Sequence, residues 1–83
     1  MCNIVFSSTA EKQLKKANTE CLVKIQKLLA SMLKDPFDGI GKPERLQSMN
    51  AWSRRIDKKN RLIYVITEET IEIVSILGHY EDH

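Results

Sequence analysis

The chain has 83 residues, of which 42% are apolar and 29% are charged, and its formal net charge is only +2. A chain this short builds one modest core, so we predict that residues 1–83 form a single domain. The small net charge does not by itself mark a nucleic-acid-binding protein, and no apolar run is long enough for a membrane span or a secretion signal.

The N-terminal third of the chain predicts one strand followed by two helices. Residues 3–7 are mainly β-branched or aromatic, which is typical of a strand. Ser8 and Glu11 have the spacing of a capping box, so we expect a first helix over 8–17 that begins at the Ser8 hydroxyl. Asn18 and Thr19 then offer a break and a new N-cap.

A second helix is predicted over residues 19–34, because apolar residues recur there every three or four positions. Asp35-Pro36 ends it, since the residue before a proline is pushed out of the helical conformation. We expect the whole apolar stripe to be core: Leu22, Ile25, Leu28, Leu29, Met32 and Leu33.

Residues 36–43 contain two glycines and two prolines and therefore predict a loop. Four strands are expected after it, at 45–48, 52–57, 61–67 and 70–77, with short hairpin connections at 58–60 and 68–69. Because the helices and strands are segregated along the chain, we predict an α+β fold with both helices on one face of a mostly antiparallel sheet.

Alternation along the strands predicts which side chains face the helices. In the strand at 61–67 these are Leu62, Tyr64 and Ile66, which places Arg61 on the opposite face with Ile63 and Val65. In the last strand, Ile71, Ile73 and Leu77 form the apolar set. Arg54 and Arg55 are neighbours, so they point to opposite faces, Arg54 with Trp52 and Ile56.

Positive charge is concentrated in one segment, with seven cations and two carboxylates between residues 42 and 61. Such a surface suits an anionic partner, although a solvated face without function is the simpler interpretation of a charge run. Cys2 and Cys21 lack metal-ligand spacing. The sequence alone leaves open whether the two cysteines form a disulfide. We expect a reduced cytoplasmic protein in which both thiols behave as small apolar groups.

Four short motifs stand out in order along the chain: Gly41-Lys42-Pro43-Glu44, Trp52-Ser53-Arg54-Arg55-Ile56, Arg61-Leu62-Ile63-Tyr64 and His79-Tyr80. Together with the preceding Pro36-Phe37 and the length and element order, they make the chain resemble the YoeB/Txe family of toxins. That family is a branch of the RelE-like superfamily found in type II toxin–antitoxin systems. The resemblance covers essentially the whole chain.

The resemblance implies a RelE-like fold and a ribosome-dependent mRNA endoribonuclease, an mRNA interferase that inhibits translation without a metal ion or other cofactor. It implies a catalytic base at Glu44, a phosphate-supporting cation at Arg61, and catalytic roles for His79 and Tyr80. The expected partners are a cognate antitoxin, the ribosome and mRNA, and a homodimer would agree with the family.

The chemistry of these residue types fits that activity. Glutamate is ionised at pH 7 and accepts a proton, histidine can carry one, and arginine stays charged beside phosphate. A tyrosine can stack on a base or donate a hydrogen bond. The remaining basic positions of the motif region are expected to hold RNA or ribosome phosphates: Lys42, Arg54, Arg55, Lys58 and Lys59.

The chain departs from the family in three places. Lys59 and Asn60 stand where many relatives have an acidic residue and a histidine, and Arg45 stands where a proline is usual. The chain also continues beyond the terminal motif with Glu81-Asp82-His83. The rival hypothesis is a non-catalytic RNA- or ribosome-binding module on the same fold, which would not need an acid–base pair.

Overall fold

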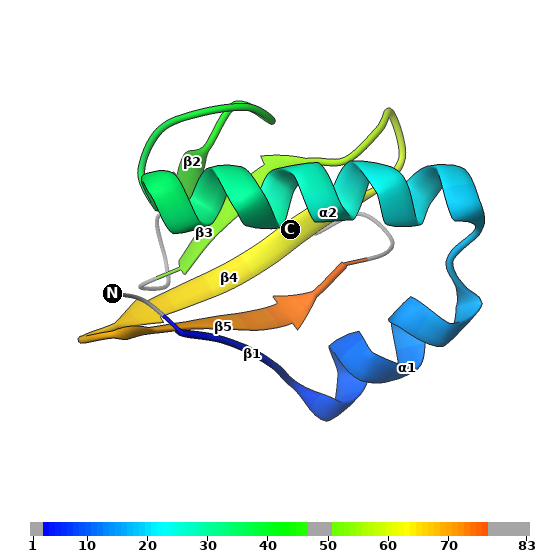
Figure 1. The fold of residues 1–83 in the computed structure, drawn as a ribbon, viewed down its shortest axis with the longest axis horizontal. Coiled ribbons are helices and arrows are strands. Elements are labelled where there is room, and N and C mark those ends of the chain that lie inside the picture. The colour runs from blue at the N-terminus through cyan, green and yellow to red at the C-terminus, as the bar shows by residue number, and fades with distance from the viewer. Residues whose placement is uncertain (1–2, 47–50, 77–83) are drawn as a thin grey trace.

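The computed structural model describes residues 3–46 and 51–76 (Figure 1). The predicted order of one strand, two helices and four strands is confirmed. The elements are β1 (Asn3–Phe6), α1 (Ser8–Lys16), α2 (Thr19–Lys34), β2 (Glu44–Leu46), β3 (Ala51–Arg55), β4 (Arg61–Thr67) and β5 (Thr70–Ser75). The strands at 45–48 and 52–57 were placed one residue late at their N-terminal ends, and 47–50 and 77 lie outside the described residues.

The five strands form one sheet in the order β1-β5-β4-β3-β2. β1 runs parallel to β5, and every other neighbouring pair is antiparallel, as the predicted α+β class requires. β1 can pair with β5 in parallel because no tight turn joins them: two helices and three strands lie between them in the chain. Among the described residues, no helix is long and apolar enough to cross a bilayer.

Both helices lie on one face of the sheet, with α2 crossing it and α1 beside β5 (Figure 1). The core joins Ile25, Leu28 and Met32 of α2 to Leu62 and Tyr64 of β4, so the predicted facing of these two strand residues is confirmed. The prediction that all six apolar residues of the second helix are core is wrong for the last of them, Leu33. Leu33 follows the buried Met32 by about 100° around the helix and is 54% exposed.

The first helix is capped by Ser7 and not, as predicted, by Ser8. Ser7 has extended backbone angles, and its hydroxyl oxygen accepts a hydrogen bond from the Ala10 N–H at 3.0 Å. The same hydroxyl donates to the Val74 carbonyl, and the Ser7 N–H donates to the Ile73 carbonyl. These bonds to the chain of β5 hold Ser7 outside the helix. The second cap, Asn18, is as predicted and accepts from the Cys21 N–H.

A register shift in the last hairpin changes which residues of β5 face the core. Tyr64 pairs with Ile73, but Ile63 pairs with Ser75, so Val74 is an extra residue. A bulge of this kind reverses the alternation beyond it. Ile76 is therefore fully buried in the core, although strict alternation placed it on the other face and gave the core position to Leu77. Leu77 lies outside the described residues.

Candidate active site

Glu44 and Arg61 meet on the sheet face away from the helices. Glu44 is aligned with Ser53, which is aligned with Ile63, so these three residues form a row across β2, β3 and β4. Arg61 precedes Ile63 by two positions and shares its face. The structure accordingly brings an Arg61 terminal nitrogen (Nη2) to 3.5 Å from a Glu44 carboxylate oxygen (Oε2).

This ion pair leaves the arginine incompletely satisfied. The side chain of Glu44 is 67% exposed and that of Arg61 is 30% exposed, so the pair itself contributes little to stability. The Nε of Arg61 is buried and has no hydrogen-bond partner within the described part of the chain. A bound anion is one explanation for a buried donor that lacks a partner among the described residues.

A second arginine lies directly beside the first. Arg55 of β3 is aligned with Arg61 of β4, so two like charges occupy facing positions in one ladder. Facing like charges are unfavourable in a sheet unless an anion lies between or near them. Together with Glu44, these arginines form a small charged site with one carboxylate and two guanidinium groups.

The other predicted site residues divide into three groups: exposed cations, one buried arginine, and two residues outside the described part of the chain. Lys42, Lys58 and Lys59 are exposed, as is Arg55, so all four are accessible to an anionic partner. Lys42 has a positive φ of 51°, at the last bend of the loop before β2. His79 and Tyr80 lie outside the described residues.

Arg54 does not agree with its prediction as an RNA contact, because it is 0% exposed. It lies on the helix face, and all five of its N–H groups are used. Its Nε donates to the Tyr64 hydroxyl, and its terminal nitrogens donate to the Ser31 hydroxyl and to the carbonyls of three loop residues: Asp35, Asp38 and Ile40. We therefore exclude Arg54 from the RNA-contacting residues.

Arg54 and Tyr64 together hold the loop that leads to Glu44. The Tyr64 hydroxyl donates to the Pro36 carbonyl at 2.8 Å, and the Arg55 N–H donates to the Gly41 carbonyl at 2.7 Å. Burial raises the pKa of the Tyr64 phenol, against the opposing effect of Arg54, so the hydroxyl remains a donor. The position of Arg54 beside Trp52 and Ile56 in the alternation was the sequence signal for its burial.

Gly39 is required where this loop passes closest to the helix. A Cβ at Gly39 would lie 2.1 Å from the Ser31 hydroxyl oxygen and 3.2 Å from an Arg54 nitrogen, and its φ is +125°. A side chain at this position would overlap with Ser31, and residues other than glycine rarely adopt this positive φ. Glycine here allows the loop carbonyls to approach the guanidinium group closely.

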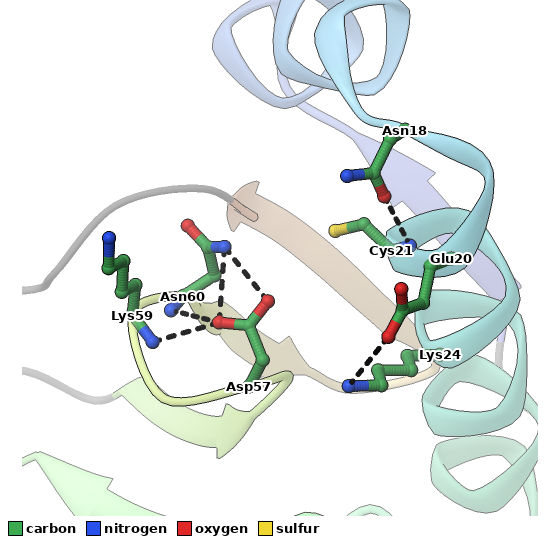
Figure 2. Close-up of polar contacts among 7 residues, drawn as sticks. All are labelled: Asn18, Glu20, Cys21, Lys24, Asp57, Lys59 and Asn60. Atoms are coloured by element: carbon green, nitrogen blue, oxygen red, sulfur yellow. Dashed lines mark hydrogen bonds and ion pairs between the residues drawn. The ribbon is translucent and has the colours of Figure 1, made fainter.

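The turn between β3 and β4 contains the departures from the family pattern at Lys59 and Asn60. One Asp57 oxygen accepts hydrogen bonds from the backbone N–H groups of Lys59 and Asn60, and the Asn60 amide donates to both carboxylate oxygens (Figure 2). These bonds hold the pKa of Asp57 below its usual value, the side-chain bond from Asn60 first. Asn60 therefore has a structural role that closes the turn.

We expect the stability of the protein to fall at acid pH partly through Asp57. A carboxyl group whose folded-state pKa is lowered stabilises the fold above its unfolded pKa of about 3.9, and that contribution is lost as the pH falls through the folded value. Urea unfolding of the wild type and of Asp57→Asn at pH 6 and near pH 2 measures it. The difference in unfolding free energy should shrink at the lower pH, and an equal difference at both pH values would contradict this role of Asp57.

Cys21 is buried in the core, as predicted for an apolar thiol. Burial raises its pKa, the Asp57 charge adds to this effect, and Lys24 opposes it (Figure 2). A raised pKa lowers the fraction of thiolate, the reactive form of the group, at neutral pH. Cys2 lies outside the described residues.

A family profile described as YoeB-like toxin of bacterial type II toxin-antitoxin system matches residues 10–80. A toxin named YoeB from Synechocystis is 44% identical over 62 residues, which are 72% of this chain and 72% of that protein. The toxin YoeB of Escherichia coli K12 is 39% identical over 59 residues, which are 69% of this chain and 70% of that protein.

Solved structures agree with these matches. A YoeB dimer from Staphylococcus aureus superposes with a TM-score of 0.84 at 36% identity, covering 95% of this chain and 98% of that one. A YoeB/ParE toxin from Agrobacterium tumefaciens gives 0.88 at 26% identity, covering 96% and 100%. YafQ from E. coli, at 19% identity and a TM-score of 0.78, shares the fold.

Proposed function

This chain belongs to the YoeB-like toxins of bacterial type II toxin–antitoxin systems, and we propose that it is a ribosome-dependent endoribonuclease that cuts mRNA in the ribosomal A site and so inhibits translation. The observation that carries the proposal is the Glu44–Arg61 pair, 3.5 Å apart on the sheet face away from the helices. A base and a phosphate-binding cation in contact are two of the three groups that metal-free RNA cleavage needs.

In the proposed reaction, Glu44 accepts the proton of the ribose 2′-hydroxyl. The 2′-oxygen attacks the adjacent phosphorus, and the bond from phosphorus to the 5′-oxygen breaks. His79 donates a proton to that leaving oxygen, which yields a 5′-hydroxyl and a 2′,3′-cyclic phosphate. Water then opens the cyclic phosphate to a 3′-phosphate. Arg61 holds the phosphate oxygens, whose negative charge increases in the transition state.

The geometry of the free protein supports an exchange of partners when RNA binds. The Glu44 carboxylate is paired with one terminal nitrogen of Arg61. A phosphate oxygen that takes over this donor would release the carboxylate to act as a base, and a second phosphate oxygen could bind the Nε, which has no partner in the described ranges of the chain. Because the pair is partly exposed and weak, this exchange costs little free energy.

Exposed cations around the pair support binding of the RNA backbone. We assign this role to Arg55, which is aligned with Arg61, and to Lys42, Lys58 and Lys59. Contacts of this kind position a strand without reading its sequence. We assign Tyr80 to stacking on a base or to hydrogen bonding at the cleavage site.

The partners of the relatives support a toxin that is held inactive in a complex. One related structure is described as a heterotetrameric complex of YoeB-YefM toxin-antitoxin from S. aureus, and another as a YoeB dimer. We propose that this chain likewise binds a cognate antitoxin, that it can form a homodimer, and that it acts on ribosomes in the cytoplasm.

Mapping of mRNA 5′ ends after a short pulse of expression tests the proposed function. We expect new 5′ ends within translated codons, and in purified reactions we expect cleavage of mRNA only when it is positioned on ribosomes. Ribosome binding with arrested translation but no new 5′ ends would instead support the non-catalytic module. Cleavage of free mRNA at the same rate would contradict ribosome dependence.

A further inference from the structure

The turn between β3 and β4 joins the two arginines of the candidate site. Arg55 is the last residue of β3 and Arg61 is the first residue of β4, and the two are aligned across the ladder. Like charges at facing positions of a sheet disfavour the pairing. The contacts of residues 56–60 must therefore hold this end of the hairpin together against the repulsion of the two guanidinium groups.

The peptide group that leads into Arg61 is held by two backbone hydrogen bonds. The Asn60 carbonyl accepts from the Ile56 N–H at 3.0 Å and from the Asp57 N–H at 3.2 Å. The Asn60 carbonyl and the Arg61 N–H belong to one planar peptide group, so bonds that fix the carbonyl also fix the plane of that N–H. These two bonds close the hairpin on the turn side of Arg61.

The Asp57 carboxylate holds the rest of Asn60. One carboxylate oxygen accepts from the Lys59 and Asn60 N–H groups at 2.8 Å each, and the Asn60 amide donates to both oxygens at 3.1 and 3.2 Å (Figure 2). Asp57 is the only acidic residue between positions 56 and 60. The residue before Arg61 is thus bound at its N–H, its side chain and its carbonyl, and Asp57 takes part in each of these contacts.

We propose that Asp57 and Asn60 are positioning residues for the cleavage reaction, because the turn that they close sets the place of the Arg61 guanidinium group. The proposal rests on the proposed function, in which Arg61 holds the scissile phosphate. The effect passes through the backbone to Arg61, whose Nη2 lies 3.5 Å from the Glu44 carboxylate. A displacement of about 1 Å at a reacting group can lower a rate by roughly 10²-fold, so a small change in the turn is sufficient.

Asp57→Ala tests this role, because it removes all four hydrogen bonds to the carboxylate. The measurement is single-turnover cleavage of ribosome-bound mRNA, expressed per folded molecule. We expect the rate at saturating enzyme to fall by roughly 10- to 100-fold. The enzyme concentration that gives half of the maximal rate should change by less than about threefold, because the cations that bind the RNA backbone remain.

Asn18→Ala is the matched control for stability. The Asn18 side chain also accepts a backbone hydrogen bond, from the Cys21 N–H at 2.8 Å, but it caps α2 and belongs to neither strand of the site. Its loss destabilises the fold and should leave the rate per folded molecule unchanged.

Two milder variants grade the effect. Asp57→Asn keeps an oxygen acceptor for the two backbone N–H groups and should therefore recover most of the rate that Asp57→Ala loses. Asn60→Ala removes only the amide bonds and should give a rate between those of Asp57→Ala and the wild type. If Asp57→Ala does not fold, Asn60→Ala serves as the test, and a rate equal to that of Asn18→Ala would overturn the proposal.

A double-mutant cycle separates positioning of Arg61 from an independent role of Asp57. If Asp57 acts through Arg61, adding Asp57→Ala to Arg61→Ala should lower the remaining rate by less than about twofold. Equal fold losses in the two backgrounds would overturn the proposal, as would wild-type rates in both Asp57→Ala and Asn60→Ala.

NMR relaxation of the Arg61 Nε–H group reports its order without any cleavage. We expect the order parameter in the free protein to fall in Asp57→Ala and to stay unchanged in Asn18→Ala. If the wild type does not cleave ribosome-bound mRNA, the proposed function fails, while this measurement still decides whether the turn holds Arg61. Slower cleavage in Asp57→Ala with an unchanged order parameter would show that the effect does not pass through Arg61.

Discussion

Replacing Arg61 with alanine is expected to lower the single-turnover rate of mRNA cleavage on ribosomes by roughly 10²–10³-fold, the usual effect of removing a group that stabilises transition-state charge. The guanidinium group is placed beside Glu44, and its buried Nε has no partner among residues 3–46 and 51–76, so it can bind phosphate oxygens in exchange for one weak ion pair. The measurement is the cleavage rate with saturating enzyme, together with the melting temperature.

The melting temperature distinguishes a loss of catalysis in Arg61→Ala from a loss of folded protein. The Glu44–Arg61 pair is partly exposed, and its loss should cost no more than about 1 kcal/mol. Arg61→Lys retains the charge but not the planar fork, so it should recover only part of the rate. Lys12→Ala, an exposed residue of α1, is the matched control. Wild-type cleavage by Arg61→Ala would remove this residue from the site.

His79→Gln tests the acid in the same assay. It should slow cleavage by roughly 10²–10⁴-fold, the range for a lost general acid. The products distinguish the mechanism, because attack by the 2′-oxygen leaves a 2′,3′-cyclic phosphate or a 3′-phosphate. Fragments with 3′-hydroxyl ends would rule out that attack even if both residues proved essential.

Replacing Arg54 should have the largest effect on stability. Arg54→Met fills a similar volume but leaves five acceptors without a donor, including the Tyr64 hydroxyl and three loop carbonyls. Each buried acceptor that loses its donor costs roughly 1–3 kcal/mol, less where water can enter. We expect a loss of at least about 3 kcal/mol, a large share of the total for a domain of this size. Urea unfolding measures it.

Arg55→Met is the matched control, because the neighbouring residue is exposed. It should change the unfolding free energy by less than about 0.5 kcal/mol and should instead weaken ribosome binding. Arg54→Lys retains the charge with at most three donors, so its stability should fall between those of Arg54→Met and the wild type. Equal stability of Arg54→Met and Arg55→Met would contradict the structural role of Arg54.

Loss of the Arg54 contacts should also loosen the loop that leads to Glu44. Hydrogen exchange at the Arg55 amide reports this, because that N–H donates to the Gly41 carbonyl. In Arg54→Lys we expect faster exchange there and slower cleavage per folded molecule. Unchanged exchange at this amide, with an unchanged rate, would show that the loop is held without Arg54.

Local patterns in the sequence determined the helices, the strands and the class of fold. Apolar spacing and the Asn18 cap specify α2, and alternation specifies which face of β4 carries Leu62 and Tyr64. These patterns depend on residues only a few positions apart, so they can be recognised in the sequence without knowledge of the fold. The motifs likewise named Glu44 and Arg61, which the structure brings together.

Only the tertiary structure decided features that depend on residues distant in sequence. Ser7, and not Ser8, caps the first helix because its hydroxyl donates a hydrogen bond to the Val74 carbonyl of β5. The bulge in β5 reverses the alternation of side chains, so Ile76 faces the core. Arg54 stands among other basic residues in the sequence, yet Ser31, Tyr64 and the loop carbonyls bury it. A charged side chain can be buried only where many acceptors converge, and that convergence is a property of the fold.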